Sequence, residues 1–248
     1  MDATLSQFRA GVIKPVECIK EGWALIKDQY WLFLGIVAVG MLIGGAVPIV
    51  LIGPMMVGVF MCYFRKMRGE QVEFGTLFKG FDHFAQSLIA ALIQMIPMVI
   101  VMVPAYIIMF AVMFASMPRG GRMSPDESSA FVITLIACYV GFFVLIMVVA
   151  LIVSIFFMFA FPLIADRGLS GVDAIKLSIK AGKANAAGIL GLVLMNFLLG
   201  IVGVLACYVG AFLVMPISFA ANAVAFRRVF PETQQTFPSP PPPPASWA

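Results

Sequence analysis

Hydrophobic and polar positions alternate along the chain in long blocks. Apolar runs cover residues 31–64, 85–116, 130–164 and 187–229, and shorter polar segments separate them. A single helix over 31–64 would be about 50 Å long, whereas the hydrocarbon core of a bilayer is about 30 Å thick. Two helices over the same run would each have about 16 residues, at the short limit for spanning. Length alone leaves both arrangements open for this run.

The distribution of charge decides between them. With two helices in the first run, one in each middle run and two in the last, every Lys and Arg except Arg119 and Arg122 falls on one side of the membrane. A single helix over the first run scatters the cations over both sides. Because cytoplasmic loops of membrane proteins are rich in Lys and Arg, we predict six transmembrane helices with both termini cytoplasmic.

An amphipathic segment precedes the first predicted hairpin of spans. Val16, Ile19, Trp23 and Ile26 recur at helical spacing, and charged residues take the other faces. We therefore predict an interfacial helix over residues 15–28, and we call such a segment a lead-in helix.

Two further lead-in helices are predicted. Residues 70–85 contain five apolar residues on one helical stripe, namely Phe74, Leu77, Phe78, Phe81 and Phe84. The third lead-in helix begins with the capping box Ser170-Gly171-Val172-Asp173 and carries a cationic face. The chain is thus predicted to be an all-α membrane bundle of three units, each a lead-in helix followed by a hairpin.

The first and last units resemble one another in sequence. Val16-Glu17-Cys18-Ile19-Lys20 matches Val172-Asp173-Ala174-Ile175-Lys176. One proline lies ten residues before an aromatic–basic triplet in each unit, Pro54 before Phe64-Arg65-Lys66 and Pro216 before Phe226-Arg227-Arg228. We therefore predict an internal duplication of the first and last hairpins, with a symmetry axis along the membrane normal.

The composition changes after Phe230. Residues 231–248 include the unbroken run Pro240–Pro244, which imposes extended polyproline II geometry and forms no core. The predicted organisation is a six-span domain over 1–230, followed by a disordered, proline-rich cytoplasmic tail over 231–248.

Overall composition excludes a soluble domain. The chain is 62% hydrophobic and 11% charged, with a mean hydropathy of +1.05. Its net charge of +4 does not indicate nucleic-acid binding, because the cations flank apolar runs. We predict contacts with anionic lipid for nine of them: Lys20, Lys27, Arg65, Lys66, Lys176, Lys180, Lys183, Arg227 and Arg228.

A few uncharged polar residues lie within the predicted spans. They are Gln94, Ser154, Asn196, Ser218 and Asn222. Hydrogen bonding between helices is their commoner role, since an amide that faces lipid would be unsatisfied. A permeation path is the alternative, and its candidate residues are Gln94, Asn196 and Asn222.

The sequence contains no motif that indicates ion coupling, a metal site or catalysis. No acidic residue lies within a predicted span, which argues against proton- or sodium-coupled transport. The four cysteines are scattered without a C-x-x-C pair, and His83 has no ligand cluster, so we expect no metal and no cofactor. Without a nucleophile elbow, Walker loop or dinucleotide fingerprint, the sequence does not indicate an enzyme.

Several segments resemble a family of uncharacterised six-helix integral membrane proteins of bacteria. The likeness rests on Ile52-Gly53-Pro54-Met55-Met56-Val57-Gly58, Arg68-Gly69-Glu70, Phe74-x-x-Leu77-Phe78-x-Gly80-Phe81 and Phe161-Pro162-Leu163-Ile164-Ala165-Asp166. These families are similar in turn to the membrane domain of some glycerophosphodiester phosphodiesterases. The resemblance covers roughly residues 15 to 230; it implies the six-helix architecture and carries no catalytic residue across.

Two functions stay open at this point. The leading prediction is a non-enzymatic scaffold of the bacterial inner membrane that contacts lipids and other membrane proteins. The alternative is an uncoupled transporter or channel for a small or amphiphilic solute. Gly40-x-x-x-Gly44 predicts close helix packing, either within the protomer or in a homodimer.

Overall fold

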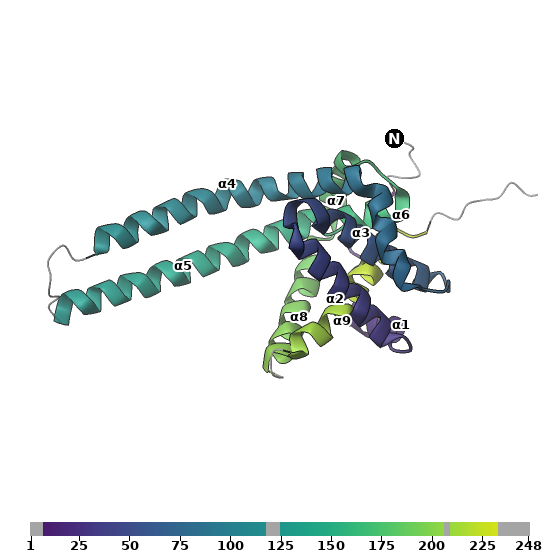
Figure 1. Ribbon diagram of the computed structural model, residues 1–248, viewed down its shortest axis with the longest axis horizontal. Coiled ribbons are helices and arrows are strands. Elements are labelled where there is room, and N and C mark those ends of the chain that lie inside the picture. The colour runs from purple at the N-terminus through teal and green to yellow at the C-terminus, as the bar shows by residue number, and fades with distance from the viewer. Residues whose placement is uncertain (1–6, 118–124, 206–208, 233–248) are drawn as a thin grey trace, which may run out of the picture.

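The structure, a computed structural model, describes residues 7–117, 125–205 and 209–232. Every regular element among these residues is a helix (Figure 1). The helices are α1 (Pro15–Ile26), α2 (Tyr30–Ala46), α3 (Pro48–Met67), the 3-10 helix η1 (Phe74–His83), α4 (Phe84–Ser116), α5 (Pro125–Phe157), α6 (Ala160–Arg167), α7 (Gly171–Ala184), α8 (Ala186–Leu205) and α9 (Val209–Val229). Residues 233–248 of the predicted tail, Arg119, Arg122 and Cys207 lie outside the described residues.

The helices fit an integral membrane protein. In the described part of the chain, five helical segments are long and apolar enough to cross a membrane: α3, η1 with α4, α5 with α6, α8 and α9. Helices α1 and α2 pass the same test only together, as a pair bent by 106°. The all-helical class is therefore confirmed, with five or six helices of the described residues long and apolar enough to cross a membrane, and six actual spans remain a prediction.

The run over 31–64 is divided into two helices. Helix α2 ends at Ala46, and Val47 leaves helical geometry with φ −132° and ψ 80°. Pro48 opens α3, where its missing N–H costs no intrahelical bond. Gly40 lies against Val59 and Leu77 of the same chain, so the predicted small-residue motif packs within the protomer.

The second lead-in segment differs from the predicted stripe. It forms the 3-10 helix η1, which has about three residues per turn. Leu77 and Gly80 consequently share one face and are buried, whereas Phe78 and Phe81 share another face and are exposed. Leu77 was expected beside all the phenylalanines; the tighter period places it with Gly80 on the face that packs on α3, away from Phe78 and Phe81.

The three units are arranged cyclically. Each lead-in helix packs on the hairpin of the preceding unit: α1 on α8 and α9, η1 on α2 and α3, and α7 on α4 and α5. The second helix of each hairpin also contacts the first helix of the next, in the pairs α3 with α4, α5 with α8, and α9 with α2. Helices α4 and α5 lie side by side and extend beyond the others (Figure 1). Internal duplication in the sequence remains a prediction.

Glycine allows the close crossings of this arrangement. A Cβ atom added at Gly22 of α1 would lie 2.7 Å from the backbone nitrogen of Ala221 in α9. One added at Gly80 of η1 would collide with the carbonyl oxygen of Pro54, and one at Gly182 of α7 with that of Ile155. Each lead-in helix therefore touches the backbone of the preceding hairpin at a residue without a side chain.

Hydrogen bonds fix the third unit at its start and at its crossing. The Oγ of Ser170 accepts a bond from the N–H of Asp173 at 3.2 Å, which is half of the predicted capping box. Ser178 of α7 donates to the carbonyl of Phe156 at 2.8 Å and accepts from the N–H of Phe159 at 3.2 Å. These bonds satisfy backbone groups at the break between α5 and α6.

Candidate functional site

Four polar side chains from four helices meet at one pocket. Gln94 of α4, Ser154 of α5, Asn196 of α8 and Asn222 of α9 line a space of about 330 Å³, which we call the polar pocket. Its other lining residues are apolar: Met56, Phe60, Val153, Phe157, Met158, Phe161, Val193 and Phe219. All three residues predicted for a permeation path are thus brought together, and Ser154 joins them.

The polar groups of the pocket satisfy one another only in part. The amide nitrogen of Asn196 donates to the Oδ1 of Asn222 at 3.3 Å. The Oε1 of Gln94 and the Oδ1 of Asn196 are buried, and neither accepts a hydrogen bond from the described residues. Because an unsatisfied buried acceptor costs about 1–3 kcal/mol, a hydrogen-bond donor that reached these atoms would stabilise them.

An apolar groove adjoins the polar pocket. It lies between α8 and α9 with a volume of about 460 Å³, and Asn196 belongs to both spaces. Phe197, Gly200, Ile201, Val204, Leu205, Ala211, Val214, Met215 and Ser218 complete its lining. We call this space the α8–α9 groove. Ser218, also noted in the sequence, therefore lies in the groove and outside the polar pocket.

An aromatic cluster leads from the polar pocket to the ends of α3 and α9. Phe60 and Phe219 of the pocket wall meet edge to face, with ring centroids 5.9 Å apart. Phe60 also stacks on Phe64, which contacts Phe226 at 5.1 Å. Phe64 and Phe226 are fully buried, so packed rings separate the polar pocket from this end of the protein.

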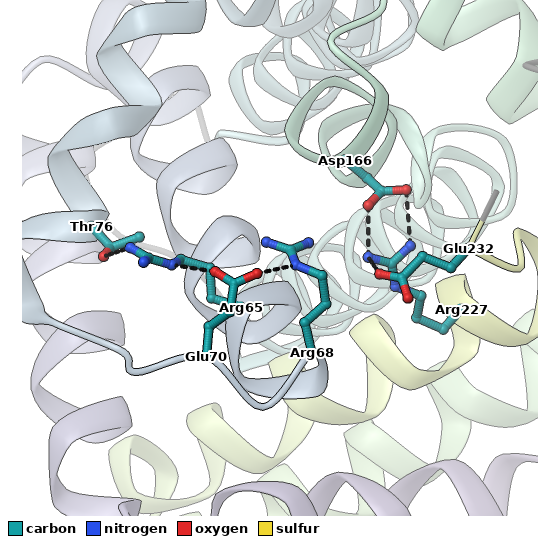
Figure 2. Close-up of polar contacts among 7 residues, drawn as sticks. All are labelled: Arg65, Arg68, Glu70, Thr76, Asp166, Arg227 and Glu232. Carbon is teal, nitrogen blue, oxygen red and sulfur yellow. Dashed lines mark hydrogen bonds and ion pairs between the residues drawn. The ribbon is translucent and has the colours of Figure 1, made fainter. Parts of the chain in front are cut away.

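Charged residues lie over these rings, and we call Asp166, Arg227 and Glu232 the charged cap. Arg227 of α9 makes two hydrogen bonds to Asp166 of α6, at 2.9 and 2.6 Å, and their side chains are only 15% and 11% exposed (Figure 2). The Arg227 guanidinium is 4.6 Å from the centroid of the Phe64 ring. Glu232 is a second carboxylate 3.3 Å from Arg227, but it is 56% exposed.

A second group of charges lies beside the first. Glu70 accepts hydrogen bonds from Arg65 at 2.8 Å and from Arg68 at 2.5 Å, and Arg65 also bonds to the Oγ1 of Thr76 (Figure 2). The bonds from Arg68 and Arg65 lower the pKa of the Glu70 carboxyl. They tie the end of α3 to the start of η1, and so hold the second lead-in helix in place.

The nine cations predicted to contact lipid fall into two groups. Four have carboxylate partners: Arg65 with Glu70, Lys66 with Asp28, Arg227 with Asp166, and Arg228 with Glu17 and Glu21. The other five are exposed and have no carboxylate within 4.0 Å among the described residues: Lys20, Lys27, Lys176, Lys180 and Lys183. Arg227 in particular joins α9 to α6, a role that the sequence analysis missed.

Comparison of the chain with known proteins gives no further information about the site. No protein family, curated protein or solved structure matches the chain. The likeness to the six-helix family remains an expectation, and the function has to be argued from the polar pocket, the α8–α9 groove and the charged cap.

Proposed function

We propose that the protein is an uncoupled membrane protein that binds a neutral amphiphile in the polar pocket and facilitates its movement in the bilayer. The observation that supports this best is the convergence of Gln94, Ser154, Asn196 and Asn222 on one space. If these residues served only to join helices, their acceptors would be expected to pair, and two remain unpaired among the described residues. This favours the alternative from the sequence analysis over a scaffold.

The lining of the pocket supports transport without ion coupling. None of its twelve described lining residues is acidic or basic. Coupled carriers bind their driving ion at intramembrane carboxylates or at unwound backbone, and charged groups in membranes mark such paths. A ligand held by amide and hydroxyl groups would therefore be uncharged.

Removing the amides is expected to slow facilitated movement. The variant Gln94→Leu/Asn196→Leu/Asn222→Leu removes the acceptors and donors of the pocket and, at positions 196 and 222, keeps the branched shape of the side chain. Loss of two ligand hydrogen bonds, each about 1 kcal/mol, would slow exchange at least about tenfold. The measurement is the rate at which a fluorescent monohexosyl diacylglycerol becomes accessible to an external quencher in proteoliposomes.

The control for this experiment is Thr134→Val. Thr134 lies in α5 and bonds to the carbonyl of Ala130 in its own helix, away from the polar pocket. This variant should exchange the probe at the wild-type rate. Wild-type proteoliposomes that exchange the probe no faster than protein-free liposomes would contradict the proposal.

A second candidate function rests on α7. Lys176, Lys180 and Lys183 recur at helical spacing on an exposed face, and we propose that they hold anionic lipid at the cytoplasmic surface of a bacterial inner membrane. A scaffold that recruits other membrane proteins could use such a face.

Neutralising this face should release bound lipid. Each Lys near an anionic surface contributes about 1 kcal/mol, so Lys176→Gln/Lys180→Gln/Lys183→Gln should retain at least about fivefold less phosphatidylglycerol in native mass spectrometry. Lys14→Gln is the control, because Lys14 already pairs with Glu17 at 3.1 Å. Equal lipid retention in both variants would remove this candidate.

A further inference from the structure

We propose that the ligand of the polar pocket is a lipid with a neutral hydroxyl- or amide-bearing headgroup, and that one of its hydrocarbon chains lies in the α8–α9 groove. The inference rests on the proposed function and adds the ligand's chemical class and its path of entry. The headgroup would occupy the polar pocket, and the chain would enter sideways from the bilayer between the two helices.

Asn196 connects the two parts of this site. It lines both the polar pocket and the α8–α9 groove, and its buried Oδ1 accepts no hydrogen bond from the described residues. The remaining lining of the groove is apolar apart from Ser218. A molecule that places a donor at Asn196 and continues into the groove must therefore be polar at one end and apolar along the other.

The position of the groove favours a hydrocarbon chain as its occupant. The groove has a volume of about 460 Å³ and is lined by α8 and α9, two helices that are long and apolar enough to cross a membrane. A flexible hydrocarbon chain fits a narrow apolar space, and the surrounding bilayer supplies such chains without an aqueous route.

The charges of the molecule favour a neutral headgroup over a phosphate. Neither the polar pocket nor the groove has a Lys or Arg in its described lining. The nearest basic residue along α9 is Arg227, which is five residues beyond Asn222 and is already bound to Asp166. A phosphate in the polar pocket would thus be desolvated without a counter-charge, which is strongly unfavourable.

Gly200 offers a specific way to block the groove. It lines the groove, and a Cβ atom added there would meet nothing within 4 Å. Gly200→Leu should therefore fill space that the chain needs without disturbing helix packing. Gly45→Leu is the matched control, since Gly45 is an exposed glycine of α2 with the same open surroundings and lies outside the groove.

The experiment uses the full-length protein in nanodiscs that contain a monohexosyl diacylglycerol with a photoreactive diazirine at the end of one chain. We expect cross-links to residues of α8 and α9 in the wild type and in Gly45→Leu. Because the added leucine and the lipid chain would compete for the same space, labelling should fall roughly fivefold or more in Gly200→Leu. A phosphatidic acid with the same diazirine chain should label the groove weakly in all three proteins.

Two results would overturn the inference. One is equal labelling of Gly200→Leu and wild type, and the other is labelling by phosphatidic acid as strong as by the hexosyl lipid. If lipid exchange is lost in the triple leucine variant while Gly200→Leu labels normally, the chain assignment is wrong and the proposed function stands. If neither variant changes exchange or labelling, both are wrong.

Discussion

Replacing Asp166 with alanine is expected to destabilise the protein by about 3 kcal/mol, because it leaves the Arg227 guanidinium largely buried without its main partner. The bidentate pair joins α6 to α9 across 61 residues of sequence, over the rings of the aromatic cluster. Breaking one partner of such a pair costs more than the pair itself contributes, since the remaining charge stays desolvated.

Glu232 provides the internal control. It binds the same Arg227 at 3.3 Å, but its side chain is 56% exposed. Glu232→Ala should therefore cost less than about 1 kcal/mol. The free energy of unfolding would be measured by SDS titration in mixed micelles for both variants. An equal loss of unfolding free energy in the two variants would mean that the burial of Asp166 does not make its pairing with Arg227 more important than that of Glu232.

A double variant separates loss of charge pairing from loss of packing. Asp166→Leu/Arg227→Met removes both charges and keeps apolar volume over Phe64. Such replacements of buried pairs are often neutral or stabilising, so most of the loss in Asp166→Ala should be recovered. A double variant as unstable as Asp166→Ala would show that specific hydrogen-bond geometry, and not desolvation, accounts for the loss.

Much of the helix arrangement follows from the sequence for identifiable physical reasons. The division of the run over 31–64 follows from charge placement together with Pro48, which cannot extend α2. The start of α7 follows from Ser170 and Asp173, because a cap is a local interaction between near neighbours. The prediction of one apolar stripe over residues 70–85 was only partly right, because the sequence does not reveal that this segment forms a 3-10 helix.

The candidate site could be predicted only in its components. Gln94, Asn196 and Asn222 stand out because amides are rare in apolar runs, but their convergence depends on how α4, α8 and α9 pack. No local sequence pattern indicates the pairing of Asp166 with Arg227. Asp166 follows a predicted span as an ordinary loop residue, and Arg227 has the basic neighbour Arg228, which made lipid contact the simpler interpretation.

The cyclic packing explains why the pocket lies where it does. Each hairpin contributes at least one helix to the polar pocket: α3 from the first, α4 and α5 from the second, and α8 and α9 from the third. The lead-in helices pack on these hairpins. The pocket is therefore a consequence of closing three units on one another, and its shape depends on the glycine crossings that allow the closure.

Adding a single methyl group at one of these crossings tests that dependence. Gly80→Ala would place a Cβ atom against the carbonyl oxygen of Pro54, in the backbone of α3. Neither group can move without shifting η1 away from α3, because both belong to helical backbone. Overpacking of this kind costs about 3 kcal/mol, and the loss would be measured by the same SDS titration.

Gly75→Ala is the matched control on the same helix. A Cβ atom at Gly75 would meet nothing within 4 Å, so this change should be neutral or slightly stabilising, by at most about 1 kcal/mol. The cyclic arrangement also predicts that Gly22→Ala and Gly182→Ala lower stability and slow lipid exchange, because each separates a lead-in helix from the preceding hairpin. If Gly80→Ala is tolerated as well as Gly75→Ala, backbone contact at this crossing does not hold the units together, and side-chain packing such as that of Leu77 must do so instead.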